Sequence, residues 1–198
     1  MDYDAFSAGV EPGGLRNTRD IGILICYMLD YLDKPFSQDD LINTIQENGI
    51  ANYFEVSSAM SELIKINNVA FSDESAKTIV ITDNGRLISH QLSSELSVSV
   101  RQKAIASLLK LTEERIIEKE NPVIISKVQG GGYNVTMQIT DGIRDLMSLT
   151  LFVPDRSIAN SVKRQFHKNP QKVYSIAIAS LIQEKELIDE AVKELQNE

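Results

Sequence analysis

The 198-residue sequence contains no tryptophan, one cysteine and two histidines. A single cysteine cannot form an internal disulfide, and it fits a protein that folds in a reducing compartment. Cys26 lies in the apolar stretch from Ile23 to Leu29, which predicts a buried, inert thiol and not a nucleophile. No apolar run approaches the ~20 residues that a membrane span requires, and the acidic N-terminus lacks the features of a secretion signal. We therefore expect a cytoplasmic protein without a membrane partner.

Residues that carry chemistry are equally scarce. Neither His90 nor His167 has a metal-ligand spacing with cysteine or carboxylates. The glycine run 130–132 lacks the lysine and serine or threonine that follow in a phosphate-binding loop, so a turn between two strands explains it. No nucleophile stands beside a base. The sequence thus predicts no catalytic residue, no metal site and no cofactor, and we do not expect an enzyme.

Positive charge is scarce in the N-terminal half. Residues 1–85 hold five Lys or Arg against fourteen Asp or Glu, a net charge of -9, while residues 86–198 carry +1, which together give the -8 of the whole chain. Negative charge favours solubility and disfavours non-specific binding to nucleic acid or anionic lipid.

Three short amphipathic helices are predicted in this acidic half. The first begins with Asn17 or Thr18 as its N-cap and ends at Lys34-Pro35, because a residue before proline avoids the helical conformation. The second runs from Ser37 to Asn48-Gly49, and the third runs from Asn52 to Asn67-Asn68. Each repeats apolar residues at helical spacing, which indicates one buried face per helix.

After the third helix, the spacing of apolar residues changes to that of a strand. Short strands are predicted at residues 69–71 and 78–82 around the polar turn 72–77, and Asp83-Asn84-Gly85 follows before a long helical region begins. Three helices followed by a hairpin is the order of a winged helix-turn-helix. We therefore predict an N-terminal arm at residues 1–16 and a winged-helix domain at residues 17–86.

Residues 87–120 are predicted to form a long connecting helix, or a helix pair divided near Ser97–Ser99. A helix of this length with apolar stripes and no evident partner within the chain favours packing on a second subunit or bracing between domains. We therefore expect a homodimer. The predicted dimerisation residues are Leu92, Leu96, Leu108, Leu111 and Ile116.

The remaining residues, 121–198, predict a small α+β domain. Strands are expected at 123–129, 133–140 and 146–153, separated by the glycine run and by Asp141-Gly142. Two helices follow, one from Asp155 or Ser157 to Asn169 and one around Tyr174–Ile182, although residues 173–178 also suit a strand. The charged end, residues 184–198, is expected to fray. Three antiparallel strands with two helices on one face is the simplest packing, and the fold class is α+β.

If the winged helix binds DNA, its third helix lies in the major groove and its hairpin lies beside the backbone. Tyr53 and Phe54 stand at the head of that helix. We expect one ring to pack inside and Tyr53 to be the exposed one. The candidate DNA-binding residues are Tyr53, Ser57, Ser58, Ser61, Lys65, Lys77, Arg16 and Arg19.

Two resemblances add to this interpretation. Ile81-Thr82-Asp83-Asn84-Gly85-Arg86 resembles the end of the wing in transcription regulators of the MarR and PadR type. The whole chain resembles an uncharacterised family of Gram-positive bacteria, domain of unknown function 4364. The residues that carry this second resemblance are Pro12-Gly13-Gly14-Leu15, Ile23-Leu24-Ile25-Cys26-Tyr27, Asn52-Tyr53-Phe54-Glu55, Phe152-Val153-Pro154 and Tyr174.

The family resemblance implies an N-terminal winged helix and no established activity. The regulator resemblance implies that the serine-bearing face of the third helix, with Lys65, is turned toward DNA. Affinity for duplex DNA depends largely on Lys and Arg, which this half contains in small number. Two hypotheses follow: a homodimeric DNA-binding regulator, and a winged-helix module that binds a protein partner through its acidic face.

Overall fold

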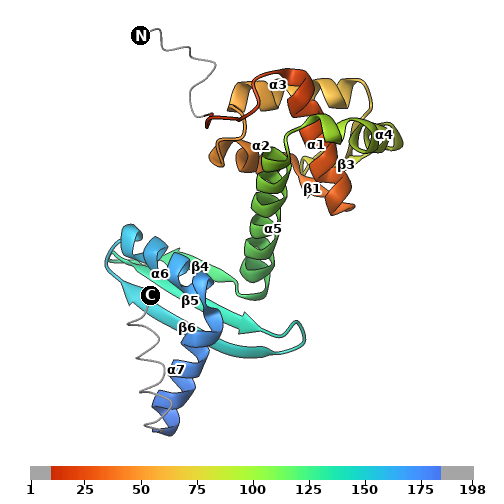
Figure 1. Ribbon diagram of the computed structural model, residues 1–198. Helices are drawn as coiled ribbons and strands as arrows, with labels where there is room; N and C mark the ends of the chain where they lie inside the picture. The colour runs from red at the N-terminus through yellow and green to blue at the C-terminus, as the bar shows by residue number, and fades with distance from the viewer. Residues whose placement is uncertain (1–9, 184–198) are drawn as a thin grey trace. The chain divides into compact units, whose positions relative to one another are not determined.

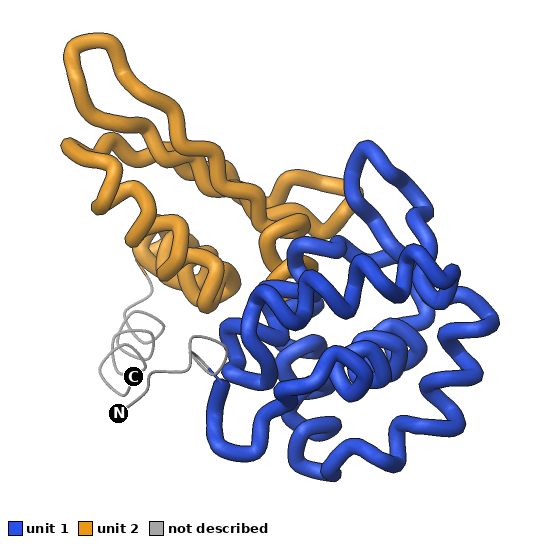
Figure 2. The backbone as a smooth tube through the Cα atoms, turned by 90° about the horizontal axis from the view of Figure 1, so that it is seen from above, with its two compact units in different colours: residues 1–112 blue, residues 113–198 orange. Residues whose placement is uncertain are grey.

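The computed structural model describes residues 10–183, and the chain divides into two compact units, residues 1–112 and residues 113–198 (Figures 1 and 2). Both units combine helices with strands, so the α+β class is confirmed. The described residues form seven α-helices and two three-stranded antiparallel sheets. None of the described helices is both long enough and apolar enough to cross a bilayer.

Three capped helices begin unit 1. In each, the residue before the first turn accepts a hydrogen bond from a backbone N–H three positions on: Asn17 from Asp20, Ser37 from Asp40 and Asn52 from Glu55. These bonds satisfy amides that have no partner within the helix. The predicted starts are confirmed. The helices are α1 (Thr18–Leu32), α2 (Gln38–Glu47) and α3 (Tyr53–Lys65).

A small sheet completes the order of elements in unit 1. Its strands are β1 (Phe36–Ser37), β2 (Val69–Asp73) and β3 (Thr78–Ile81), and β3 lies between the other two. The hairpin of β2 and β3 was predicted. β1 was not, because two residues after Pro35 are too few to show a period. It is held by its pairing with β3, where Phe36 lies opposite Ile79.

The long helical region was expected to begin after Asp83-Asn84-Gly85, and it begins earlier in the structure. These residues form the first turn of α4 (Asp83–Leu92), because the Thr82 side chain accepts a hydrogen bond from the Gly85 N–H and caps the helix. A short 3-10 turn, Ser93–Glu95, separates α4 from α5 (Val98–Glu120). The connecting region is therefore a helix pair, and its break lies just before the predicted position.

Helix α1 occupies the centre of unit 1, where other elements cover almost all of it. Its neighbours bury Cys26 and the apolar residues around it, and the expectation of a buried cysteine is confirmed. The first half of α5 contributes Val100, Ala104 and Leu108 to the same core. The largest side chains that are fully enclosed here are Ile21, Leu24, Ile25, Met28, Leu29, Leu41, Ile45, Ile50, Met60, Ile79 and Leu108.

Unit 2 is a three-stranded antiparallel sheet with two helices on one face (Figures 1 and 2). Strand β5 lies in the middle, and its alternate residues Val135, Met137 and Ile139 are buried with Ala159 and Phe166. The predicted packing is confirmed, and residues 173–178 are helical. The expectation for residues 184–198 lies outside the described residues. The elements are β4 (Val123–Lys127), β5 (Tyr133–Thr140), β6 (Asp145–Val153), α6 (Arg156–Lys168) and α7 (Pro170–Ile182).

Candidate nucleic-acid interface

One face of α3 is buried and the other is open to solvent. Val56, Ala59, Met60 and Leu63 point into the core of unit 1 and hold the helix in place. The opposite side is a mixed stripe that carries one cation and one anion. Its exposed members are Tyr53, Phe54, Ser58, Ser61, Glu62, Lys65 and, just beyond the helix, Ile66.

The three predicted serine contacts differ in their surroundings. Ser58 is exposed and free to meet a ligand. Ser61 is exposed, but its hydroxyl donates to the Ser57 carbonyl oxygen at 2.8 Å. Ser57 itself is half-buried, and its hydroxyl oxygen is enclosed without a hydrogen-bond partner in the described part of the chain. Of the three, Ser58 presents its hydroxyl most directly to an approaching surface.

The expectation that one aromatic ring packs inside is wrong. Tyr53 is 49% exposed and Phe54 is 76% exposed, and the two rings meet edge to face with centroids 5.8 Å apart. The corner between α2 and α3 is instead filled by Ile50 and Ala51, which are fully buried. Two neighbouring aromatic rings therefore stand in solvent at the head of α3.

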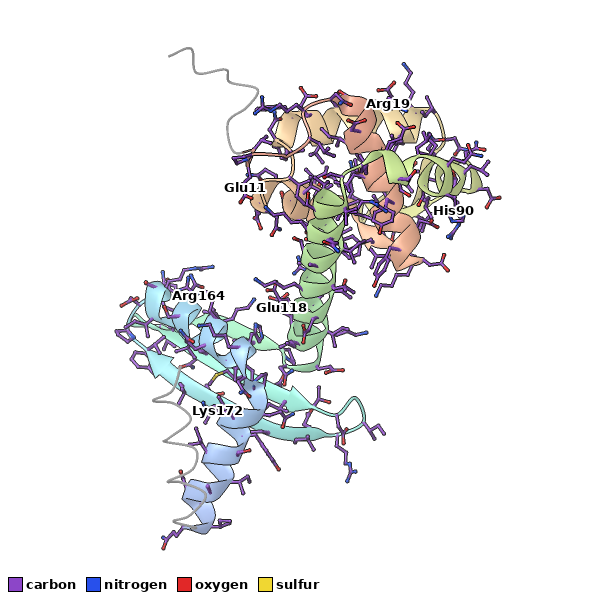
Figure 3. All side chains as sticks on the ribbon, in the orientation of Figure 1. Glu11, Arg19, His90, Glu118, Arg164 and Lys172 are labelled. Carbon is purple, nitrogen blue, oxygen red and sulfur yellow. The ribbon has the colours of Figure 1, made fainter. Side chains whose placement is uncertain are left out.

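Two of the four predicted cationic contacts are already neutralised. Arg19 forms an ion pair with Glu95, with 2.8 Å between nitrogen and oxygen, and Lys77 lies 3.5 Å from a carboxylate oxygen of Asp39 (Arg19 is labelled in Figure 3). Arg16 and Lys65 are exposed and form no ion pair within residues 10–183. Unit 1 thus offers few unpaired positive charges.

The turn between β2 and β3 is organised around a carboxylate. One oxygen of Asp73 accepts hydrogen bonds from the Ser75 hydroxyl at 2.7 Å, the Ala76 N–H at 3.1 Å and the Ser75 N–H at 2.9 Å. The Ser75 hydroxyl and the Ala76 amide lower the pKa of Asp73 below its ordinary value, so the carboxylate stays ionised. Lys77 follows with a φ of 48°. The tip of the hairpin is therefore well defined and partly anionic.

A polar cluster joins α4 to α1. Arg86 donates to Asp30 at 2.9 Å and also contacts Asp33, and the Nε2 atom of His90 lies 3.0 Å from the second oxygen of Asp30. Asp30 is 14% exposed in its side chain, so it is largely enclosed by its partners. The motif that ends in Arg86 was recognised in the sequence, but its two carboxylate partners lie more than fifty positions away and gave no local signal.

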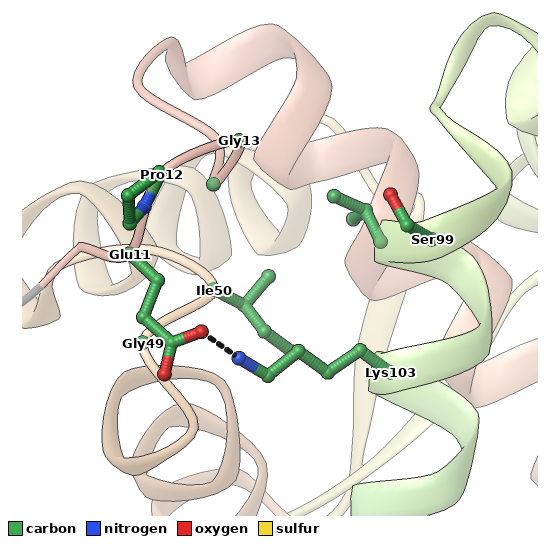
Figure 4. A pocket seen from close by; sticks show the side chains of 9 residues that line it. Glu11, Pro12, Gly13, Gly49, Ile50, Ser99 and Lys103 are labelled. Carbon is green, nitrogen blue, oxygen red and sulfur yellow. Dashed lines mark hydrogen bonds and ion pairs between the residues drawn. The ribbon is translucent and has the colours of Figure 1, made fainter.

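Figure 4 shows one surface recess of unit 1, where Lys103 of α5 is paired at 2.5 Å with Glu11, the neighbour of Pro12. Within the described residues no three His, Cys, Asp or Glu side chains gather as metal ligands. This recess is lined otherwise by Gly49, Ile50, Ser99 and Val100.

The predicted dimerisation residues do not form one surface. Leu96 and Leu108 are buried in the core of unit 1, so their expected exposure to a partner is wrong. Leu92 and Leu111 are half-buried, and Ile116 is 50% exposed. The predicted helical spacing was correct, but the inner side of α5 packs into the core of unit 1 and not against a second subunit. The apolar residues that α5 does expose in unit 1 are Val98 and Leu109, beside Tyr31 of α1.

Comparison with protein families gives one match over residues 21–181, to a family described as Domain of unknown function (DUF4364). The chain belongs to this family. The matched segment reaches from α1 to α7, so it includes both units of this DUF4364 member. None of the curated proteins and none of the solved structures compared with it is detectably similar.

Proposed function

We propose that unit 1 is a winged helix and that this DUF4364 protein is a DNA-binding transcriptional regulator that acts as a homodimer. The observation that carries the proposal is the order α1, β1, α2, α3, β2, β3 with the sheet order β1-β3-β2. In that order α3 follows α2 closely and leaves its outer face uncovered, beside a hairpin of fixed shape. A helix in this position suits the major groove.

The exposed residues of α3 suit contacts to base edges better than contacts to phosphates. Ser58 has an exposed hydroxyl that can donate to or accept from a base edge, and Glu62 can accept from the amino group of cytosine. Lys65, unpaired within the described residues, supplies a phosphate contact from the same side of the helix. One cation per recognition helix gives little affinity, so a dimer that doubles the contacts is part of the proposal.

The test is binding of the purified protein to genomic DNA fragments at ~50 mM salt, where phosphate contacts are strongest. We expect salt-dependent binding that selects a subset of fragments. Replacing Ser58, Ser61 and Lys65 with alanine should abolish the selection. A matched variant with Asn43→Ala and Gln46→Ala, exposed positions of α2, should retain it. Absence of any salt-dependent binding by the wild-type protein contradicts the proposal.

A second candidate function is a protein-docking module, and one observation favours it. Phe54 and Tyr53 form an exposed aromatic pair on an acidic unit, which fits a basic protein surface with an apolar centre. The double variant Tyr53→Ala and Phe54→Ala separates the two functions. Loss of a co-purifying partner with DNA selection unchanged favours docking, and loss of DNA selection favours the regulator.

A further inference from the structure

Helix α6 in unit 2 carries a cationic stripe on its outer side. Arg156, Asn160, Arg164 and Lys168 follow one another at intervals of four residues, and all four are exposed. Side chains at this spacing lie on one side of a helix. The opposite side, with Ala159 and Phe166, is buried against the sheet. The stripe is therefore turned away from the core of unit 2 (Arg164 is labelled in Figure 3).

The charges of this stripe are not neutralised by neighbours. Helix α6 contains no Asp or Glu between Arg156 and Lys168. Arg156, Arg164 and Lys168 form no ion pair in the described residues, and Arg164 only donates to the Ser161 hydroxyl at 3.1 Å. Lys163 is different, because it lies 3.5 Å from Glu118 of α5. The stripe thus presents three unpaired cations beside one amide.

The stripe also stands on a fixed support. The Nε2 atom of His167 lies 2.8 Å from the Asn121 carbonyl oxygen, and Glu118 joins Arg115 and Lys163 next to it. The side-chain oxygen of Asp155 caps the first turn by accepting from the Ile158 N–H at 2.9 Å. These contacts hold both ends of α6, so the backbone that carries the exposed cations needs little ordering when they bind a ligand.

Positive charge in unit 2 is concentrated in its middle. Unit 1 holds nine Lys or Arg against fifteen Asp or Glu and unit 2 holds eleven against thirteen, but residues 122–183 within unit 2 hold seven against three. In a chain with a net charge of -8, a helix with four Lys or Arg and no acid is a marked local excess. The four stripe positions span about 18 Å of helix, a length of duplex that carries about ten phosphates.

We propose that the outer face of α6 binds the phosphate backbone of duplex nucleic acid through Arg156, Arg164 and Lys168. This inference rests on the proposed DNA-binding function and assigns it a second surface. The α3 helix distinguishes sequences, and α6 supplies affinity that does not depend on sequence. The charge of the face determines the class of ligand, since three unpaired cations complement a polyanion.

The experiment uses the full chain and a mixed-sequence duplex, with the dissociation constant measured by fluorescence anisotropy over a series of salt concentrations. One variant carries Arg156→Gln, Arg164→Gln and Lys168→Gln. A second variant carries Lys34→Gln, Lys65→Gln and Lys77→Gln, which removes the same number of charges from exposed positions of unit 1, including the proposed phosphate contact of Lys65, and so measures what unit 1 contributes. Circular dichroism verifies that both variants are folded.

The slope of log K against log salt is negative, and each phosphate contact contributes about 0.9 to its magnitude. We therefore expect the magnitude of the slope to be smaller by about 2.7 in the α6 variant. The inference is overturned if the wild-type protein binds and the α6 variant binds equally well. If only the unit 1 variant then loses affinity, the proposed function survives. Failure of the wild-type protein to bind any duplex overturns both. Equal affinity for a polyglutamate peptide identifies an acidic protein as the ligand and also overturns the inference.

Discussion

Gly85 lies directly against the backbone carbonyl of Asn68, and a Cβ atom built on Gly85 would come within 2.2 Å of that oxygen. The same carbonyl accepts a hydrogen bond from the Thr82 N–H at 3.1 Å, and the Thr82 hydroxyl donates to the neighbouring Asn67 carbonyl at 2.8 Å. The start of α4 is thereby fixed to the turn that follows α3. Only glycine leaves room for this approach.

The first prediction concerns that contact. Glycine within a helix is ordinarily less favourable than alanine by about 1 kcal/mol, but Gly85→Ala should destabilise the protein by at least about 2 kcal/mol because the backbone must move. Gly22→Ala in α1 is the matched control. Its new Cβ would lie 3.8 Å from a methyl group of Leu63, an ordinary contact, so that variant should be neutral or more stable. Urea denaturation measures both. Equal stability of the two variants contradicts the prediction.

The second prediction concerns the thiol of Cys26. Burial, with a smaller contribution from the charge of Asp30, raises its pKa to about 12. At pH 8 the native protein should react with a thiol reagent at least ~10³-fold more slowly than the unfolded chain, because the thiolate is the reactive species. Absorbance after reagent is added, with and without denaturant, is the measurement. Rapid reaction of the native protein would show that α1 opens.

The third prediction concerns pH and Glu118. Burial opposes its ionisation, but the hydrogen bond from Arg115 and the charges of Lys163, Arg115 and His167 outweigh it and lower its pKa below the ordinary 4.5. A lowered pKa stabilises the folded state above pH 4.5, and this contribution is lost as pH falls through the folded value. Glu118→Gln should therefore destabilise at pH 7 by up to about 1 kcal/mol, and this cost should shrink as the pH falls below 4.5.

The control for this pH series is Glu120→Gln, which removes the same charge from an exposed position near the end of α5. Urea denaturation at several pH values should show little difference between this variant and the wild-type protein. If the Glu118 and Glu120 variants respond alike, general charge explains the effect and the local ion pairs do not.

The fourth prediction concerns Arg86, which contacts Asp30 and Asp33 together. Lysine delivers a single point charge and lacks the planar fork with which Arg86 meets the two carboxylates. Arg86→Lys should therefore lower the melting temperature of the protein. Arg19→Lys is the control, because the surface pair of Arg19 with Glu95 should contribute little. An unchanged melting temperature for Arg86→Lys contradicts the role assigned here.

Features set by local chemistry were predictable from the sequence. Asn17, Ser37 and Asn52 cap helices as expected, because a short polar side chain before an apolar period satisfies free amides. The strands of unit 2 were predictable because glycine and Asp141-Gly142 mark their turns. The pairing of β4, β5 and β6 then followed from the connections.

Other features were not predicted, and only some of them depend on distant parts of the chain. The two-residue β1 exists because β3 lies beside it, and Asp83 to Gly85 form a helix because Thr82 caps them. Tyr53 and Phe54 are both exposed because Ile50 and Ala51 occupy the corner that one ring was expected to fill. Periodicity shows that Leu108 faces something apolar, but it does not distinguish the chain's own core from a second subunit.

Because the sulfhydryl of Cys26 is buried and is expected not to react, the chain is suited to site-specific labelling. A cysteine placed on the surface would be the only one to take up a maleimide label, without any change to the native residue. Single sites on α3 and on α6 could then carry spin labels or fluorophores in an otherwise unaltered chain. Such a pair would report, by the distance between the two labels, whether added duplex DNA changes the separation of α3 and α6, which the two proposed binding surfaces lead us to expect.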